Sequence, residues 1–439
     1  MKKLFLLILL LPVMIFGLEF DEAKFLLNRT CFGASRSDIN ALENLSYEKA
    51  VTNLIKSAST TPKSDYPKWK GKFILQSVDW SKLSAEEKKV LKKLRRQRGK
   101  ELQKWWLNEM AVTDSPLTEK MTLFWHNHFT SELGKVKWPS LMLDQNILFR
   151  KYALGSFADM LRDIAKDPAM IVYLDNRTNK KSHPNENFAR ELMELFTLGE
   201  GHYTEKDIKE AARAFTGWTI DLKTGKFKFN RRVHDFGEKT FLGESGNFDG
   251  DDIIEIILKQ ERTAEFITEK FYKEFISYNI NQDEVKRIAK IFKESDYQIK
   301  TLLYEILTSD DFKDKSKRDL LIKSPVELVI GTSRTFNEKT VPSKQFFKRT
   351  KNMGQEVLNP PNVKGWQGKK EWMSTNYLME RRNFLKKAGK VLERKYKKSS
   401  KYSIEELKQL LLPVEASTQI TDRKNRFSAV LLDPAYELK

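Results

Sequence analysis

The stretch PNENFARELMELFTLG, residues 184–199, most constrains the fold, because it has the pattern of one complete helix with both ends marked. Pro184 suits the first turn, where its missing N–H costs no hydrogen bond, and Gly199 suits the left-handed residue that follows a helix. Apolar side chains recur between them at helical spacing, at Phe188, Leu192, Leu195 and Phe196. The sequence therefore predicts a helix that buries one face in a core.

A second face of this predicted helix is polar. Its residues lie at positions i, i+3, i+4 and i+7, and they are Asn187, Arg190, Glu191 and Glu194. One interpretation is a solvated face, in which pairs such as Glu186–Arg190 and Arg190–Glu194 add about 0.2–0.5 kcal/mol each. The other interpretation is that this face looks into a buried polar site. The helix by itself leaves both open.

Residues 1–17 have the pattern of a secretory signal peptide. Two lysines precede an apolar run, and Gly17 closes it. We therefore expect an exported protein, located in the periplasm or outside the cell.

The single cysteine, Cys31, excludes an intramolecular disulfide and is expected to be a small core residue. Residues 18–439 are expected to form one α-helical domain, with two lobes as the alternative because the length is large for one core.

Positive charge is concentrated in two segments of a chain whose net charge is +19. Residues 82–104 hold ten basic and three acidic residues, and residues 381–401 hold ten basic and one acidic. Both carry apolar residues at helical spacing, so we expect basic amphipathic helices. They either form solvated faces or contact an anionic polymer, lipid headgroups or an acidic partner. Expected export and the lack of a nucleic-acid motif argue against nucleic acid.

Most of the remaining sequence also predicts helices. One such helix opens at Ser115-Pro116 and continues through LTEKMTLFWHNHF, and Thr204 with Asp207 forms a capping box for another. Residues 219–229 give the only hairpin signal, and the tail after residue 413 is expected to be an extended arm. The fold class predicted is mainly α, a multi-helix globular fold with one small β-hairpin. The other expected helices are residues 21–29, 46–57, 84–110, 156–165, 252–259, segments within 263–312, a helix opening at 324, 376–392 and 403–412.

The five histidines lie within about a quarter of the chain: His126, His128, His183, His202 and His234. Histidine and carboxylate side chains are what a metal site or general acid–base catalysis requires. A divalent transition metal held by His126, His128, Glu191 and His234 is therefore one hypothesis. The alternative is that these are core residues, and no known zinc-site pattern such as HExxH occurs. His126 and His128 lie about 200° apart on a regular helix, so both cannot face one site unless the helix ends near His126.

Taken together, the motifs resemble the bacterial domain-of-unknown-function 1800 family. The stretches that carry the resemblance include LLNRTCFGAS, LTEKMTLFWHNHF, NENFARELMELFTLG, VHDFGEKTFLG, SPVELVIGTSR and NPPNVKGW, in family order along nearly the whole chain. The resemblance implies export and gives no established activity to carry over. It also implies a partner, because members are often encoded beside the exported, sulfatase-like domain-of-unknown-function 1501 family. The motif positions it implies are His126, His128, Asn185, Glu186, Asn187, Arg190, Glu191, Glu194, Arg213, Trp218, His234, Asp235, Asn362 and Trp366.

One segment departs from the family pattern. Where relatives tend to have a His-Pro before Thr-Ala, this chain has Gln260-Glu261-Arg262 before Thr263-Ala264. We therefore expect that the family's histidine at this position has a structural role.

Two functions follow as hypotheses. The first is a metal-assisted hydrolase acting on an envelope or extracellular substrate, with a polar site formed by the central helix, the WHNH helix and the VHD loop. In it, Glu191 or Glu194 would be ligand or general base, His128 and His234 ligands or acid–base groups, and Arg190 a clamp for an anionic group. The second is a non-catalytic binding or assembly factor, in which the polar residues form a buried network and the basic helices dock an acidic partner.

Overall fold

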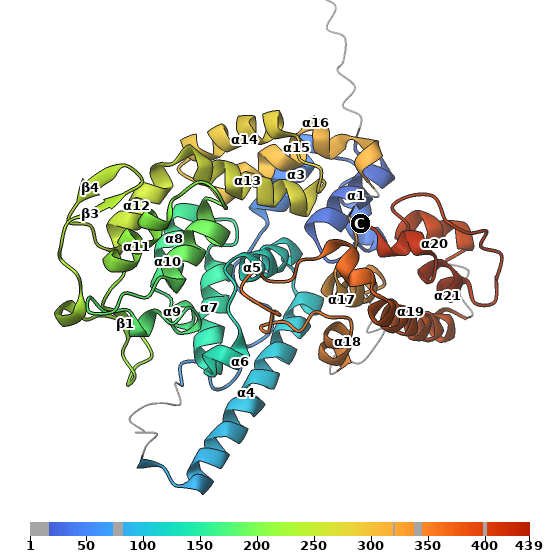
Figure 1. The fold of residues 1–439 in the computed structure, drawn as a ribbon. Helices are drawn as coiled ribbons and strands as arrows, with labels where there is room; N and C mark the ends of the chain where they lie inside the picture. Colours follow the sequence, from blue (N-terminus) through green and yellow to red (C-terminus); the bar gives the residue numbers. More distant parts are fainter. Residues whose placement is uncertain (1–16, 73–81, 319–320, 338–344, 398–401) are drawn as a thin grey trace, which may run out of the picture.

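This computed structural model describes residues 17–72, 82–318, 321–337, 345–397 and 402–439 (Figure 1). The expected signal peptide therefore lies outside the described residues except for Gly17, as do the last four residues of the second basic segment. The predicted fold class is confirmed, since the chain is mainly helical. None of the helices in the described ranges is both long and apolar enough to cross a membrane.

The first half of the chain contains α5, which carries the WHNH segment, and the helices before and after it up to α11. They are α1 (Phe20–Thr30), α2 (Arg36–Asn40), α3 (Tyr47–Lys56), α4 (Ala85–Val112), α5 (Pro116–His128), α6 (Leu133–Val136), α7 (Pro139–Lys151), α8 (Phe157–Ala165), α9 (Pro168–Tyr173), α10 (Asn187–Glu191) and α11 (Glu205–Ala214).

The second half adds the helices from α12 to α21. They are α12 (Gly250–Lys259), α13 (Glu261–Phe275), α14 (Gln282–Glu294), α15 (Ile299–Thr308), α16 (Asp310–Lys313), α17 (Pro325–Thr335), α18 (Phe346–Asn352), α19 (Thr375–Tyr396), α20 (Ile404–Leu411) and α21 (Arg426–Leu431). Figure 1 shows α5 in the middle of the molecule, α13 to α15 above it and α17 to α21 to its right. The buried apolar side chains, including Cys31, form one continuous cluster from Leu18 to Tyr436.

Helix starts follow the capping signals of the sequence. The hydroxyl of Thr204 accepts a hydrogen bond from the Asp207 N–H, and the Asp207 carboxylate accepts one from the Thr204 N–H. Ser84 caps α4 in the same reciprocal way, and Ser324 caps α17. The acidic turn before α12 is also a cap, because the Asp249 carboxylate accepts hydrogen bonds from the first turn. Each cap satisfies backbone donors that a helix leaves without partners.

The central helix begins later than predicted and changes its winding. Residues 184–186 precede it, α10 starts at Asn187, and from Leu192 the chain continues as the π-helical segment η3 (Leu192–Thr197). Gly199 ends it with a positive φ of 83°, as predicted. A π turn holds more residues than an α turn, so the side chains of η3 are rotated relative to the stripes expected from a regular helix.

The β structure exceeds the prediction by one hairpin. The expected hairpin pairs β1 (Trp218–Ile220) with β2 (Phe227–Phe229) in antiparallel register, Thr219 opposite Lys228. A second hairpin, β3 (Lys239–Phe241) with β4 (Glu244–Gly246), lies at the same end of the molecule and packs on α11. Its strands are only three residues long, which is too short for an alternating pattern to be distinctive.

The C-terminal tail is not the extended arm that was expected. It forms α21, which packs on α19 and α20, and ends in a buried turn that contains Glu437. The Arg381 guanidinium of α19 is buried and forms an ion pair with Glu437 at 2.6 Å. One arginine of the second basic segment is therefore a core residue, although seven basic side chains of α19 and its end remain exposed, from Arg382 to Lys397.

Candidate functional site

The polar face of the central helix is an ion-paired surface. The Arg190 guanidinium makes two hydrogen bonds to Glu205, at 2.8 and 2.9 Å, and a third to Glu186 at 3.2 Å. These contacts raise the pKa of Arg190. The Glu194 carboxylate accepts a hydrogen bond from the Tyr203 hydroxyl at 3.3 Å. Because Arg190 is fully engaged by carboxylates of its own chain, the structure gives it no role as a clamp for a substrate.

Glu191 and Asn187 lie at the edges of this face. Glu191 is half-buried, and its desolvation, together with the neighbouring Glu194, raises the pKa of its carboxyl group. The Asn187 amide donates a hydrogen bond to the Leu174 carbonyl at 3.1 Å, which ties the start of α10 to the end of α9. Asn187 is thus bonded to the backbone, and Glu191 is the member of the stripe with the most perturbed carboxyl group.

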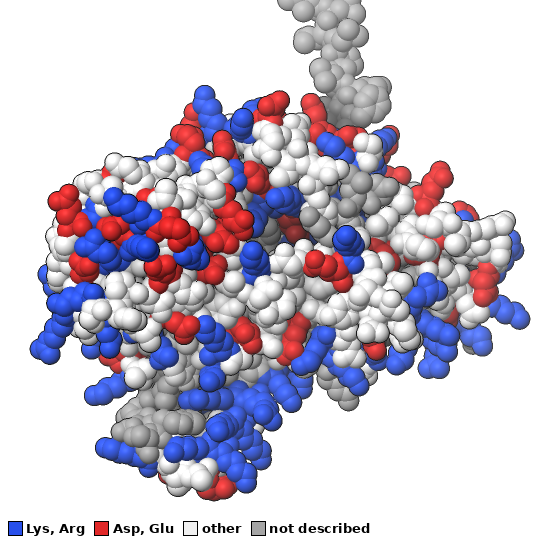
Figure 2. Space-filling model, in the orientation of Figure 1, with Lys and Arg blue, Asp and Glu red and all other residues white. Residues whose placement is uncertain are grey.

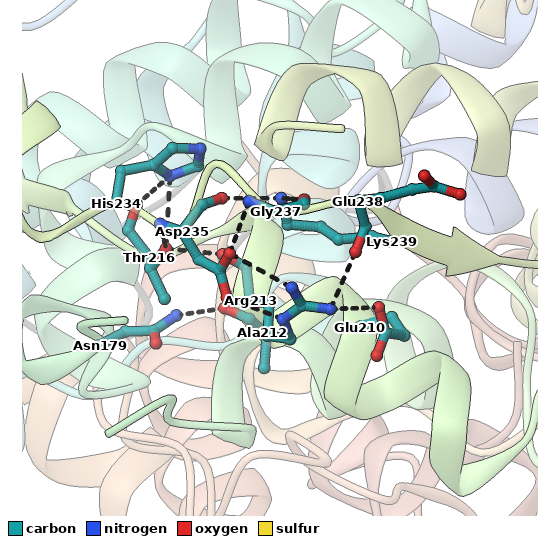
Figure 3. A network of polar contacts seen from close by, with 10 residues as sticks. All are labelled: Asn179, Glu210, Ala212, Arg213, Thr216, His234, Asp235, Gly237, Glu238 and Lys239. Carbon is teal, nitrogen blue, oxygen red and sulfur yellow. Dashed lines mark hydrogen bonds and ion pairs between the residues drawn. The ribbon is translucent and has the colours of Figure 1, made fainter. Parts of the chain in front are cut away.

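The VHD loop is locked by its own hydrogen bonds (Figure 3). His234 Nδ1 lies 2.8 Å from the Thr216 carbonyl oxygen, which can only accept, so Nδ1 carries the proton. The Arg213 guanidinium binds both oxygens of Asp235, at 2.7 and 3.2 Å, and also Glu210 at 2.7 Å. The hydrogen bonding by the Arg213 guanidinium is the main reason that the pKa of Asp235 is lowered. This network ties the loop to the end of α11 and engages the Arg213 guanidinium, the Asp235 carboxylate and Nδ1 of His234 within the protein.

The two histidines of α5 face different surroundings, as their spacing predicted, although the helix does not end at His126. His126 is enclosed by aromatic side chains, among them Trp106 and Trp366, with ring centroids 5.5 and 5.8 Å away. His128 Nε2 donates a hydrogen bond to the Phe196 carbonyl at 3.0 Å. Burial lowers the pKa of each imidazole to about 3, so both are neutral at physiological pH.

The hypothetical metal ligands do not come together. Among the residues that the structure describes, no group of three or more His, Cys, Asp or Glu side chains could hold a metal ion. His234 is hydrogen-bonded to Thr216 beside the hairpins, whereas His128 is hydrogen-bonded to η3. His126 instead packs among aromatic side chains that include Trp106 and Trp366. The metal set that was expected from the histidine distribution, His126, His128, Glu191 and His234, is therefore not supported by the geometry.

A pocket of about 370 Å³ lies instead between α5, α13, α17 and the NPPNVKGW loop. The space-filling view shows a hollow in this central region, bordered by basic and acidic side chains (Figure 2). Of the predicted site residues, only His128 and Trp366 line it. The charged residues that line it are Lys120, Lys270, Lys273, Glu274, Glu327, Lys364 and Lys439.

Four of these charges neutralise one another. The ammonium groups of Lys120 and Lys439 both contact the carboxylates of Glu274 and Glu327, with Lys120 2.9 Å from Glu274 and Lys439 2.6 Å from Glu327. The Lys120 and Glu327 side chains are 3% and 7% exposed. The two lysines lower the pKa of Glu327 although burial opposes this, so its carboxylate stays ionised. We call these four residues the buried quartet.

Three further lysines give the pocket an excess of positive charge. Lys270 and Lys273 extend from α13 beside Glu274, and neither has a hydrogen bond or ion pair within the described part of the chain. Burial, and to a lesser extent Lys273, lowers the pKa of Lys270 to about 8. Lys364 is on the loop, 3.8 Å from Glu200 and half exposed. With the quartet neutral, these side chains attract an anion.

The NPPNVKGW loop is clamped to α5 by the residue between the two histidines. The Asn127 side chain accepts a hydrogen bond from the Trp366 N–H at 2.7 Å and donates one to the Trp366 carbonyl at 3.3 Å. Gly365 has a φ of 73°, and a Cβ atom there would lie 2.3 Å from Asn127 Oδ1. Only glycine permits this approach. The Asn362 side chain is exposed and accepts a hydrogen bond from the Lys364 N–H, so it shapes the same loop.

Sequence reasoning overlooked the lysines and glutamates of the pocket. One signal was present, because Lys120 is three residues after Leu117 and four before Phe124, which places it on the apolar face of α5. A lysine on a core face needs a buried partner. The partners, Glu274 on α13 and Glu327 on α17, lie more than 150 residues away, and nothing local identifies them.

Comparisons with known proteins identify a family for the chain. Curated proteins give no match to the chain, and neither do solved structures. A family model described as "Protein of unknown function (DUF1800)" matches residues 25–433, which include nearly every residue that lines the pocket. The chain therefore belongs to the DUF1800 family.

Proposed function

We propose that this protein binds an anionic ligand in its central pocket and serves as an exported binding factor for an acidic envelope or extracellular polymer. The observation that carries the proposal is the excess of three lysines over the neutral quartet in one pocket. A carboxylate, phosphate or sulfate group there would pair with Lys270 and Lys273 in a partly desolvated setting, where ionic hydrogen bonds are strong.

The walls of the pocket fit a sugar-sized ligand. Its apolar lining includes Phe124, Trp366 and Trp372, while Gln355 and Gln367 offer amide groups. Its volume of 370 Å³ lies within the usual size of small-ligand sites, and its lining is more highly charged than the mostly apolar walls typical of such sites, as a pocket for an anionic ligand requires. A single acidic sugar unit, or the terminal unit of an acidic polymer, is therefore a suitable occupant.

A metal-assisted hydrolase is the alternative, and the chemistry of the pocket favours it less. A general acid must hold a proton near neutral pH. Glu274 and Glu327 are kept ionised by the two lysines beside them, and the pKa of His128 is about 3. None of these three would therefore carry a transferable proton. Lys270, whose pKa is about 8, does carry one at neutral pH, and in our proposal its ammonium group pairs with the anion.

The binding proposal is tested by calorimetry with small anions. Phosphate, sulfate and galacturonate are titrated into the protein, with neutral galactose as the uncharged control. We expect the Lys270→Met/Lys273→Met variant to bind anions about tenfold or more weakly, since two charge-assisted contacts are lost. The matched variant Lys286→Met/Lys290→Met removes the same charge from exposed positions of the neighbouring α14 and should bind as the native protein does. Equal affinities of the two variants would refute the proposal.

Elemental analysis separates the binding factor from the metalloenzyme. The native protein, prepared without a His-tag, is compared with His128→Ala/His234→Ala. We expect equal metal content, because these side chains donate to backbone carbonyls in separate places. A stoichiometric transition metal that the variant loses would favour the hydrolase instead.

The family resemblance adds a candidate protein partner, an exported sulfatase-like protein. We propose that such a contact would use the exposed basic side chains of α19. Co-purification that weakens as ionic strength rises would support it, because exposed charges are screened by salt.

A further inference from the structure

Helix α4 leaves the body of the protein. Its C-terminal part packs against the core, with buried residues from Gly99 onward, whereas residues 85–98 have none. Figure 1 shows this N-terminal half projecting below the rest of the fold. The projecting half has a few contacts near its base, such as the hydrogen bond from Arg98 to the Lys72 carbonyl at 3.1 Å, and much of its surface is exposed.

One side of this helix is a continuous row of cations. The residues recur every three or four positions, so they share one face, and all are exposed: Lys89, Lys92, Lys93, Arg96, Lys100 and Lys104. We call this row the basic stripe. At 1.5 Å per residue it extends for about 22 Å. In the space-filling view, Lys and Arg side chains outnumber acidic ones at the corresponding lower end of the molecule (Figure 2).

The basic stripe has little compensating negative charge. Its one recorded ion pair joins Lys89 to Glu86 at 3.7 Å, between two largely exposed side chains, and such pairs are weak. Within the described residues the other five cations have no ion pair. Several of them are four residues apart, and like charges at this spacing destabilise a helix. An external polyanion would relieve that repulsion.

We propose that the basic stripe of α4 binds a flexible acidic polysaccharide through charge alone. The stripe contains no aromatic residue on which a base could stack, which argues against single-stranded nucleic acid. Leu91 and Leu94 lie on the opposite side of the helix, so the exposed Val90 beside the stripe is a single small apolar side chain, too little to anchor the helix in a lipid interface. This site is separate from the central pocket and does not depend on its occupancy.

The test uses fluorescein-labelled alginate, a polyuronate, with neutral dextran as the uncharged control. The variant Lys89→Gln/Lys93→Gln/Arg96→Gln/Lys100→Gln neutralises the stripe. We expect its alginate affinity at low salt to fall about tenfold or more, with a shallower dependence on salt, because fewer counterions are released. Circular dichroism verifies that the helix content is unchanged.

The control variant removes the same charge from scattered exposed positions on α11 and α14: Lys206→Gln/Lys209→Gln/Lys286→Gln/Lys290→Gln. It should keep native alginate affinity. Equal losses in both variants would overturn the proposal, since net charge would then explain binding. Stripe-dependent binding to anionic phosphatidylglycerol vesicles or to a single-stranded DNA oligomer, without binding to alginate, would overturn it as well. The Lys270→Met/Lys273→Met variant alters only the central pocket. Its alginate affinity therefore shows whether a failed prediction concerns the basic stripe or the pocket.

Discussion

Replacing Glu327 by glutamine tests whether the buried quartet supports the pocket. The Glu327 carboxylate contacts Lys120 and Lys439 and accepts a hydrogen bond from the Ser324 N–H at 2.7 Å. Glutamine keeps the shape and an oxygen for the helix cap, but it removes one negative charge. Two buried ammonium groups would then share the single carboxylate of Glu274, whose side chain is 30% exposed.

The expected cost of this change is about 3–5 kcal/mol of the free energy of unfolding, because removal of one partner leaves a buried charge without compensation. An exposed pair provides the matched control. Arg162 contacts Glu255 at 2.6 Å with side chains 40% and 49% exposed. Glu255→Gln should cost about 1 kcal/mol or less, since water solvates both charges there.

The assay is urea denaturation followed by far-UV circular dichroism and tryptophan fluorescence, with free energies from linear extrapolation. The double variant Lys120→Met/Glu327→Gln leaves a neutral Lys439–Glu274 pair and should be less destabilised than the sum of its single variants. The pKa of Glu327 is lowered in the folded protein, so its contribution is complete above the unfolded value of about 4.3 and declines as pH falls below it. A cost for Glu327→Gln no greater than that for Glu255→Gln at neutral pH would refute the reasoning.

Three further predictions concern the pocket and the VHD loop. Anion affinity should fall as pH rises through about 8, where the Lys270 ammonium loses its proton, and calorimetry of Lys270→Met at pH 6.5 and 9 should show a flatter profile. Gly365→Ala should destabilise the protein by about 1–3 kcal/mol and weaken anion binding, because its φ is 73° and its Cβ would collide with Asn127; melting temperature and titration report both. Arg213→Gln should lower stability by about 1–3 kcal/mol through loss of the paired contacts to Asp235, yet leave anion affinity native in the same titration.

Local signals explain which elements could be predicted from the sequence. Ser84 and Thr204 cap helices with partners only three residues away, so the relevant chemistry lies within one window of sequence. The switch to a π turn at Leu192 has no such signal, because it accompanies tertiary contacts such as the hydrogen bond from His128 to the Phe196 carbonyl. The second hairpin was missed since its turn places Leu242, rather than a typical turn residue, at a positive φ beside a glycine.

Residue type alone did not predict how the histidines and the polar stripe are surrounded. The histidines drew attention because imidazole is common in metal and acid–base sites, yet burial among aromatic rings makes His126 and His128 structural bases with little affinity for protons. The polar stripe of the central helix proved to be the solvated alternative, with Arg190 paired to Glu205. Both outcomes depend on which groups surround a side chain in the folded protein. The spacing of residues within one helix gives no information about those groups.

The WHNH segment shows how the parts of the pocket depend on each other. His128 holds the end of η3, while Asn127, pointing another way, holds the backbone of Trp366 through two hydrogen bonds. One turn of α5 thereby fixes two walls of the pocket, and Lys120, two turns earlier on the same helix, fixes the quartet beneath them. Because the quartet is neutral by itself, the charge that a ligand meets comes from Lys270 and its neighbours on α13. Rigid walls with uncompensated cations favour recognition of an acidic group over proton transfer. Because the quartet supports the fold and the lysines of α13 meet the ligand, variants of the quartet test stability and variants of these lysines test binding.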